Sequence, residues 1–302
     1  MSAFHHVTVL GAASVDALAQ VPAGWVIDCT LGGGGHSELV LQRLDHVRVL
    51  GLDRDPAALS AARERLAGYG DRFKAVHASF AELAQVCAEE GITQLSGLIA
   101  DLGVSSHQLD TFERGFSFRA DGPLDMRMDT TRGETLADKL AQTSKRELAD
   151  VLYYYGDERA SHRVADAILA AFGDGVRGTA ELADRIAAVL PRGGKIHPAT
   201  RSFQALRMWV NEEIEQLERL VATAPGLLAP AGVMAIISFH SGEDRVVKQV
   251  FREFAKGKYG DYELPHRKPL LPSAEESAHN PRARSAKLRT LRRKDRQVEE
   301  AA

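Results

Sequence analysis

Hydrophobic residues in the first third of the chain follow two alternating patterns, one typical of buried strands and one typical of amphipathic helices. Short apolar runs predict strands, and apolar residues at a helical spacing predict helices. We therefore expect strands over residues 25–30, 47–53, 73–77 and 97–102, separated by helices over 37–45, 56–68 and 80–90. Strands that alternate with helices favour a parallel sheet with right-handed crossovers, so this part is predicted to be an α/β domain.

The alternation stops after residue 104 and resumes near Gly232. Residues 105–130 show no clear period, and the stretches that follow are amphipathic with a helical period. The expected elements are helices at 144–154, 158–172, 179–190 and 203–224 and a strand at 232–239. We predict a helical domain at residues 105–200, inserted into a discontinuous sheet domain formed by residues 1–104 and 201–302.

Local signals refine this outline at three places. Thr179 is a candidate N-cap of its helix, and Pro225 is expected to follow the end of the long helix. Residues 256–283 are rich in Pro, Lys, Ser and Glu, which is typical of a flexible surface segment.

Composition places the chain among globular proteins of the reducing cytoplasm. It has 302 residues, of which 44% are hydrophobic and 26% charged. Cys29 and Cys87 form no C-x-x-C pair, so neither a disulfide framework nor a metal site is predicted. No signal peptide is recognised, and the apolar stretch from Gly226 to Phe239 is too short for a membrane span.

A run of four glycines, Gly32 to Gly35, follows the first strand and precedes the first helix of the alternating pattern. Such a turn lets a nucleotide approach the backbone closely. The spacing departs from a dinucleotide fingerprint, and an acidic residue, Asp28, stands just before the turn. This D-x-x-x-G-x-G pattern resembles the first motif of S-adenosylmethionine-dependent methyltransferases. A nicotinamide-dependent dehydrogenase stays open as an alternative, because Rossmann turns are shared.

Acidic residues end the second and fourth strands. Asp53 lies about 20 residues past the glycines, where a carboxylate accepts hydrogen bonds from ribose hydroxyls. Capping of the next helix is the competing role for Asp53, although Asp55 can also fill it. Asp101 ends the fourth strand and is expected to lie beside the glycine turn, since ligands bind at the carboxyl ends of parallel strands.

Six blocks, in order along the chain, resemble the bacterial 16S ribosomal RNA (cytosine-N4) methyltransferase family. The blocks are Asp101-Leu102-Gly103-Val104-Ser105-Ser106, Arg114-Gly115-Phe116-Ser117-Phe118, Leu124-Asp125-Met126-Arg127-Met128-Asp129, His197 to Arg207, Ser238-Phe239-His240-Ser241 and Asn280 to Ser285. The resemblance runs from His6 to about Arg289. It implies a Rossmann-like class I methyltransferase sheet with an inserted all-helical domain, and a methyl transfer to the N4 amine of a cytosine.

The resemblance also implies S-adenosyl-L-methionine as the methyl donor. The cofactor-binding residues carried over are Gly34, Gly35, His36, Asp53, Phe80, Asp101 and Gln108. The Phe80 ring is expected on the adenine face, with an ordinary core aromatic as the alternative. The chain departs from the family pattern at Gly242, where a leucine is usual, at His107, where a proline is usual, and at Gly11-Ala12-Ala13, where acids are usual.

Methylation of a cytosine amine requires positioning and acceptors for the amine hydrogens more than a strong base. Asp101 is the candidate catalytic acceptor, although it can instead bind only the amino group of the donor. His240, at the end of the fifth strand, is a candidate proton acceptor, and a buried, hydrogen-bonded histidine is the favoured alternative.

Arginines and phenylalanines in the family blocks are the candidate RNA contacts. The main candidates are Arg114, Phe116, Phe118, Arg127 and Arg201, with Phe112, Arg119 and the basic run from Arg282 to Arg296 as further candidates. Packing is the alternative role for the phenylalanines, and a solvated tail is the alternative for the basic run. The expected partner is 16S rRNA in small ribosomal subunit particles. A non-catalytic ribosome-assembly factor that retains the fold stays open as an alternative function.

Overall fold

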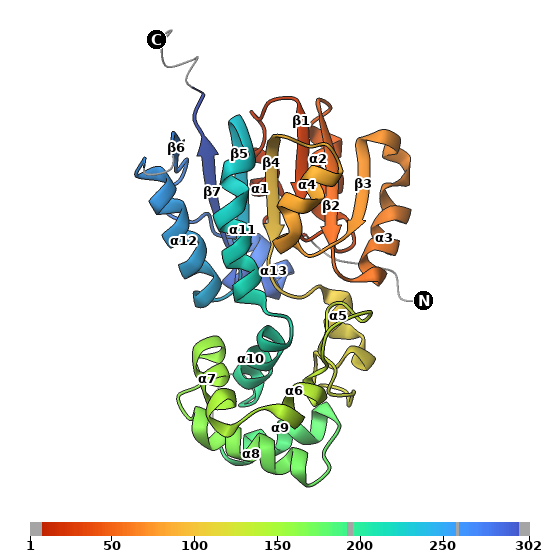
Figure 1. Ribbon diagram of the computed structural model, residues 1–302, viewed down its shortest axis with the longest axis vertical. Helices are drawn as coiled ribbons and strands as arrows, with labels where there is room; N and C mark the ends of the chain where they lie inside the picture. Colours follow the sequence, from red (N-terminus) through yellow and green to blue (C-terminus); the bar gives the residue numbers. More distant parts are fainter. Residues whose placement is uncertain (1–7, 192–195, 258–259, 296–302) are drawn as a thin grey trace. The chain divides into compact units, whose positions relative to one another are not determined.

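The computed structural model describes residues 8–191, 196–257 and 260–295 (Figure 1). The chain divides into two compact units. The sheet unit comprises Met1–Gly103 and Ile214–Ala302, and the helical unit comprises Val104–Glu213. The predicted insertion stops at residue 200, which is the first residue of a helix that the structure assigns whole to the helical unit.

The sheet unit is built on one seven-stranded sheet with the order β3-β2-β1-β4-β5-β7-β6. The strands are β1 (Gly24–Asp28), β2 (Val47–Asp53), β3 (Phe73–His77), β4 (Leu95–Asp101), β5 (Leu228–Ser238), β6 (Tyr262–Glu263) and β7 (Lys287–Arg293). Strands β1 to β5 are parallel to one another, and β7 is antiparallel to both β5 and β6. The five predicted strands are confirmed, with ends shifted by a few residues.

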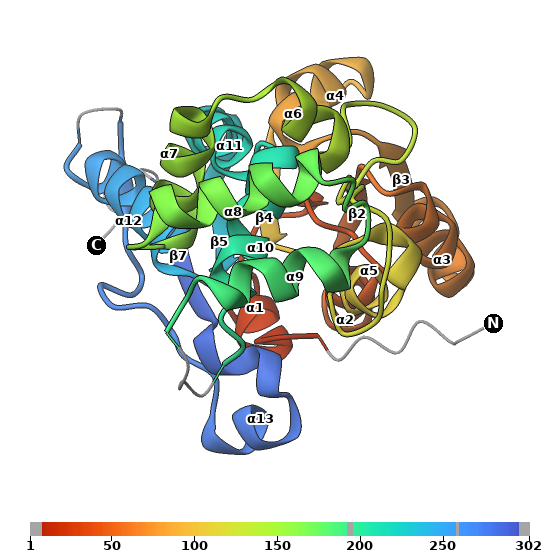
Figure 2. The same ribbon diagram turned by 90° about the horizontal axis from the view of Figure 1, so that it is seen from below.

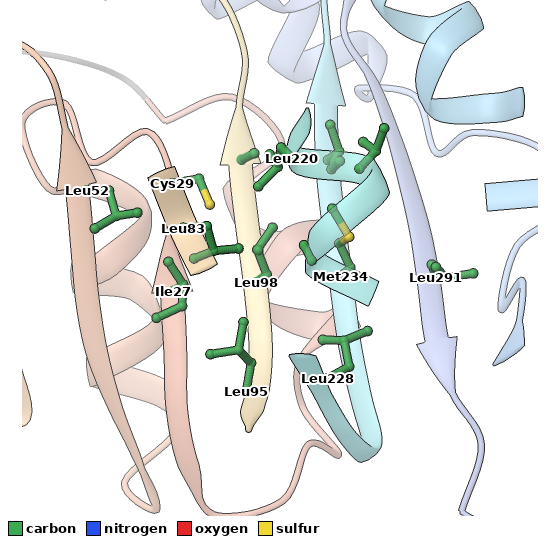
Figure 3. Close-up of a cluster of buried hydrophobic side chains, with 14 of the residues drawn as sticks. Ile27, Cys29, Leu52, Leu83, Leu95, Leu98, Leu220, Leu228, Met234 and Leu291 are labelled. Carbon is green, nitrogen blue, oxygen red and sulfur yellow. The ribbon is translucent and has the colours of Figure 1, made fainter. Parts of the chain in front are cut away.

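Buried side chains alternate between the two faces of this sheet because successive residues of a strand point to opposite sides. Ile27, Leu50 and Leu98 belong to one core cluster, part of which is drawn in Figure 3. Val26 and Val49, their neighbours in β1 and β2, belong to the other cluster. Strands buried on both faces read as continuous apolar runs, which is why the sequence located them.

Helices cover both faces of the sheet. They are α1 (Gly11–Ala17), α2 (Gly35–Arg43), α3 (Pro56–Leu66), α4 (Leu83–Glu89), α11 (Glu213–Leu227), α12 (Ser241–Ala255) and α13 (Ala274–His279), with 3₁₀ turns η1 (Ala67–Arg72), η2 (Phe80–Glu82) and η4 (Pro281–Ser285). The helices predicted in the first third of the chain are confirmed as α2, α3 and η2 with α4. Residues 256–283, predicted to be a flexible segment, instead contain β6 and α13 in their described part.

The helical unit has its own buried core, which includes Met126, Leu148, Ile168 and Leu206. Its elements are α5 (Ser106–Asp110), η3 (Phe112–Arg114), α6 (Leu136–Gln142), α7 (Lys145–Gly156), α8 (Ser161–Gly173), α9 (Thr179–Ala188) and α10 (Thr200–Val210). Helix α7 packs against both α8 and α10, and α8 packs against α9 (Figure 2). The predicted helices at 144–154, 158–172 and 179–190 are confirmed as α7, α8 and α9.

Three predictions about helices in this region are wrong. The single helix expected over 203–224 is two helices, α10 and α11, because Glu212 adopts a left-handed φ of 50° between them. The second of these continues past Pro225 to Leu227, so the proline lies inside the last turn of the helix and not after its end. Thr179 is not an N-cap: Gly178 takes that position, and Thr179 Oγ1 instead accepts a hydrogen bond from Gly122 N at 3.0 Å.

No helix in the described ranges is long and apolar enough to cross a membrane.

Candidate active site

The glycine turn between β1 and α2 requires glycine at two positions. Gly32 and Gly34 have φ values of 51° and 80°, in the left-handed region that side chains disfavour. Gly34 is the N-cap of α2, so the free amides of the first helical turn face the turn. A turn of this shape is typical of loops in which a ligand approaches main-chain groups directly.

Asp28 is buried next to the glycine turn and stabilises it through hydrogen bonds. It is 1% exposed, accepts a hydrogen bond from Ser37 Oγ at 2.7 Å and accepts another from Thr30 N at 3.2 Å. Burial raises the pKa of Asp28 to about 6, against the lowering effect of these bonds. The acidic residue of the sequence motif therefore has a structural role within the turn.

Asp53 presents a fixed carboxylate at the end of β2. Its Oδ2 accepts from Gly32 N at 2.7 Å, and its Oδ1 accepts from Asp55 N at 2.8 Å. Asp55 caps α3 by accepting from Ala57 N, so capping is not the role of Asp53. Burial raises the pKa of Asp53 to about 6. Each oxygen keeps a second lone pair, which suits it to ribose hydroxyls.

His36 is a buried, neutral histidine in the first turn of α2. Its Nε2 lies 3.1 Å from Val9 O, and because a carbonyl only accepts, Nε2 carries the proton and Nδ1 the lone pair. Burial lowers the pKa of His36 to about 4. The adjacent residue Leu10 donates its backbone N–H to Glu276 Oε1 at 2.6 Å. The α13 residue Glu276 thus holds the backbone segment against which His36 is oriented.

Asp101 is the open acceptor of the site. Its backbone N–H donates to Thr30 Oγ1 at 2.6 Å, which ties the end of β4 to the glycine turn. Its Oδ2 lies 3.9 Å from the lone pair of His36 Nδ1, and its buried Oδ1 has no hydrogen-bond partner among the described residues. Burial, and then the charges of Asp28 and Glu243, hold its pKa well above the usual value.

Asp101 Oδ2 and His36 Nδ1 are two acceptors 3.9 Å apart, and the unpaired Asp101 Oδ1 lies beside them. A positively charged hydrogen-bond donor fits such a set of acceptors. The ammonium group of S-adenosylmethionine has that chemistry. The residues of the sheet unit therefore fit the implied cofactor: Asp101 and His36 toward its ammonium end and Asp53 toward its ribose.

Phe80 is half-buried as the first residue of η2 and packs against the core cluster of Figure 3. The preceding Ser79 caps this turn with Glu82, and Ser79 Oγ donates to Gln216 Oε1 at 2.7 Å. Phe80 therefore packs as a core aromatic. Only the exposed part of its ring is available to contact an adenine.

His240 caps α12 and is not arranged as a base. Its Nδ1 accepts from Gly242 N at 3.2 Å and from Glu243 N at 3.4 Å, so the ring lone pair faces the helix. Its Nε2 lies 3.0 Å from the buried Glu243 carboxylate. This is the hydrogen-bonded histidine favoured from the sequence. A side chain at position 242 would place its Cβ 3.2 Å from Nδ1, so Gly242 leaves the ring room.

The remaining candidates belong to the helical unit, and several are held by their own neighbours. Gln108 is buried, and its Oε1 accepts from Ser105 N at 3.0 Å in a capping box of α5. Arg114 donates to the carbonyl oxygens of Arg127 and Met128. Phe116 lies in the core, and the Phe118 ring packs on Phe203 with centroids 4.8 Å apart.

The other candidates differ in their ion pairing and in their exposure to solvent. Arg127 forms a two-pronged ion pair with Asp125, whereas Arg201 and Arg119 are exposed. Phe112 is 48% exposed. The basic run from Arg282 to Arg296, for which a solvated tail was the alternative, lies instead largely in η4 and β7, and Arg289 in β7 pairs with Asp244 at 2.7 Å. Arg296 lies outside the described residues.

The strand order 3-2-1-4-5-7-6 with an antiparallel seventh strand, and the glycine turn and carboxylates at the carboxyl ends of β1, β2 and β4, are those of a class I S-adenosylmethionine-dependent methyltransferase. The MraW methylase family matches residues 3–294, and the chain belongs to that family.

Curated relatives with the name ribosomal RNA small subunit methyltransferase H cover nearly the whole chain. The protein of Trichlorobacter lovleyi is 47% identical over 96% of this chain and 98% of its own length. That of Synechococcus elongatus is 48% identical over 97% and 96%. That of Sorangium cellulosum is 50% identical over 95% and 90%.

Proposed function

We propose that the protein transfers a methyl group from S-adenosyl-L-methionine to the exocyclic N4 amine of one cytosine in 16S rRNA. The observation that carries the proposal is the unpaired, buried oxygen of Asp101 beside the glycine turn. The names of the relatives support small-subunit rRNA as the substrate. Family membership favours this activity over a nicotinamide-dependent dehydrogenase.

Six residues of the sheet unit make up the proposed donor site. Asp53 binds the ribose hydroxyls, Phe80 covers the adenine, and the turn residues Gly34 and Gly35 let the donor approach the backbone. His36 Nδ1 and Asp101 accept from the ammonium group. Gln108 is proposed near the methionine end of the donor.

The reaction needs alignment more than acid–base strength. A sulfonium methyl is already activated, so the N4 lone pair attacks the methyl carbon, the electron pair of the broken bond stays on sulfur, and N4 releases a proton. The N4 lone pair is delocalised into the ring, and an acceptor for the N4 hydrogens localises it. We assign this acceptor role to Asp101, because His240 directs its lone pair into α12.

RNA recognition is proposed for the helical unit. Arg201, exposed on α10, is suited to meet a phosphate directly. Arg114, Phe116, Phe118 and Arg127 are held by internal contacts, and we propose that they shape the surface that receives the RNA. A small ribosomal subunit particle in the cytoplasm is the proposed substrate form.

Mapping of the modified nucleotide tests the proposal. Small ribosomal subunits from a strain that lacks the gene are incubated with methyl-labelled donor and the purified protein, and the labelled nucleotide is identified. We expect a single N4-methylated cytosine in 16S rRNA, and far less label in free cytidine. Donor binding without transfer to any ribosomal RNA would instead indicate a non-catalytic assembly factor.

A further inference from the structure

We propose that the solvent face of α12 binds the phosphate backbone of the RNA substrate. The surface is a line of four cationic side chains, Arg245, Lys248, Arg252 and Lys256, which we name the α12 basic row. The proposal rests on the proposed function in so far as RNA is the substrate. It adds a contact surface on the sheet unit to the arginines of the helical unit.

The four residues lie on one side of the helix. They are separated by three, four and four positions, which is the spacing of neighbours along one helical face. The opposite face carries the buried residues Glu243, Val247, Phe251 and Phe254. Arg245, Arg252 and Lys256 are exposed and Lys248 is half-buried. At 1.5 Å per residue the row is about 16 Å long.

Acidic side chains do not neutralise the row. No ion pair joins its four members to any carboxylate in the part of the chain that the structure describes. Asp244, on the same helix, is bound instead by Arg289 at 2.7 Å and Lys287 at 3.4 Å, both from β7. Glu243 is buried against His240, and Glu253 lies on the flank of the row. A chain of net charge −3 thus concentrates positive charge here.

The location of the row suits a nucleic acid that enters the site. Helix α12 begins directly after β5, at the sheet edge where Asp53 and Asp101 end their strands, and it packs beside β7 and β6 (Figure 1). Arg245 follows the cap residue His240 by five positions. A strand of RNA whose target base is at that edge can therefore extend along α12.

The chemistry of the row favours RNA over an acidic protein. A protein interface needs buried aromatic or aliphatic anchors at its centre. Apart from the cations, the exposed residues of α12 are the polar Ser241 and Gln249, and Val246 and Val250 pack against the core instead. Regularly spaced cations without an apolar anchor are the pattern that phosphate backbones meet.

Charge neutralisation with a matched control tests the proposal. The test variant combines Arg245→Gln, Arg252→Gln and Lys256→Gln, the three exposed members of the row. The control combines Arg43→Gln, Arg63→Gln and Lys74→Gln, which are exposed residues of the sheet unit with partners of their own. Both variants lower the net charge by three. Binding of each to naked 16S rRNA fragments is titrated over a range of salt concentrations, alongside donor binding.

We expect the row variant to bind RNA roughly tenfold more weakly at about 0.1 M salt and to lower the salt slope by about two, since each phosphate contact on a single strand contributes about 0.7. Its donor affinity should equal that of the wild type. A row variant with the slope of the wild type, or an equal loss in the control variant, would overturn the proposal. A wild-type protein that binds RNA but modifies no cytosine contradicts the proposed function alone, because the binding readout needs no methyl transfer.

Discussion

Burial controls the protonation of the ionisable residues around the glycine turn. It raises the pKa values of Asp28 and Asp53 to about 6, holds that of Asp101 well above its usual value, and lowers that of His36 to about 4. Without a bound cation, this burial favours the neutral forms of these side chains. The positive charge of the donor would reverse this preference at Asp101, so donor binding and proton release are expected to be linked.

Asp53→Ala should weaken donor binding. The substitution removes the ribose acceptor and costs on the order of 2 kcal/mol, or tenfold or more in affinity. Calorimetric titration with S-adenosylmethionine measures the change, and Asp45→Ala, at a fully exposed aspartate, serves as the control. Equal affinities for the two folded variants would refute the assignment of Asp53 to the ribose.

Donor affinity should decrease as the pH falls, and Asp101 should carry part of that decrease. Protonation below its raised pKa removes the negative charge that the ammonium group needs. Calorimetry from about pH 8 to about pH 5 compares the wild type with Asp101→Asn, in which this titration is absent. The variant should bind more weakly at high pH and depend less on pH. Parallel curves for the two proteins would show that Asp101 does not contact the donor.

Among the helices and strands, the sequence predicted those whose positions depend on a local pattern of apolar residues. Strands β1 to β5 were located because strands buried on both faces are continuous apolar runs. The break between α10 and α11 was missed because its contacts are distant in sequence: Asn211 Nδ2 donates to Met126 O, and Asn211 Oδ1 accepts from Met128 N. The basic run concealed β7, in which Leu288 and Thr290 are buried between charged residues.

Helix α13 offers a test of how the donor site is supported from a distant element. Glu276→Ala should remove the acceptor for Leu10 N and loosen the segment that orients His36, with a several-fold loss of donor affinity. ¹⁵N NMR of the His36 ring should show a larger fraction of the Nδ1–H tautomer.

Two variants control this prediction. Glu276→Gln keeps an acceptor oxygen and should restore most of the affinity, and Glu275→Ala, at the exposed neighbour, should change nothing. An unchanged His36 tautomer in Glu276→Ala would show that α13 does not orient His36.

The stability of the whole molecule should follow the buried groups as the pH changes. The pKa of Asp28 in the folded state, about 6, exceeds the ordinary 3.8, so the unfolded chain releases this proton first and stability is lost as the pH rises from 3.8 through about 6. His36 acts oppositely: its pKa falls from 6.5 to about 4, so stability is lost as the pH falls below 6.5. The two effects oppose each other in the intervening range.

Asp28→Asn isolates one of these contributions. Between about pH 4 and about pH 7 the wild type should lose about 2 kcal/mol of unfolding free energy relative to the variant, as the shift of its pKa requires. Urea unfolding of both proteins at the two pH values measures this difference. A difference that is independent of pH would show that Asp28 titrates normally.

The sequence predicted the positions of candidate site residues where a motif lies within one segment, and it missed contacts whose partners are far apart. The glycine turn, Asp53 and Asp101 stand at strand ends that the pattern locates. Glu243 and Glu276 were missed, because their roles depend on His240 and on a backbone group 266 residues away. No local signal marks either glutamate as part of the site.

Single-turnover methylation by Asp101→Asn shows whether the Asp101 carboxylate, at the end of β4, belongs to a methyl-transfer site for RNA. Unmodified small ribosomal subunits, wild-type or variant protein and a range of labelled donor concentrations yield both the donor affinity and the rate of transfer to cytosine N4. Loss of a charged acceptor predicts a combined decrease of about a hundredfold or more in rate over dissociation constant. A variant that methylates the same cytosine with unchanged rate and donor affinity would contradict the account.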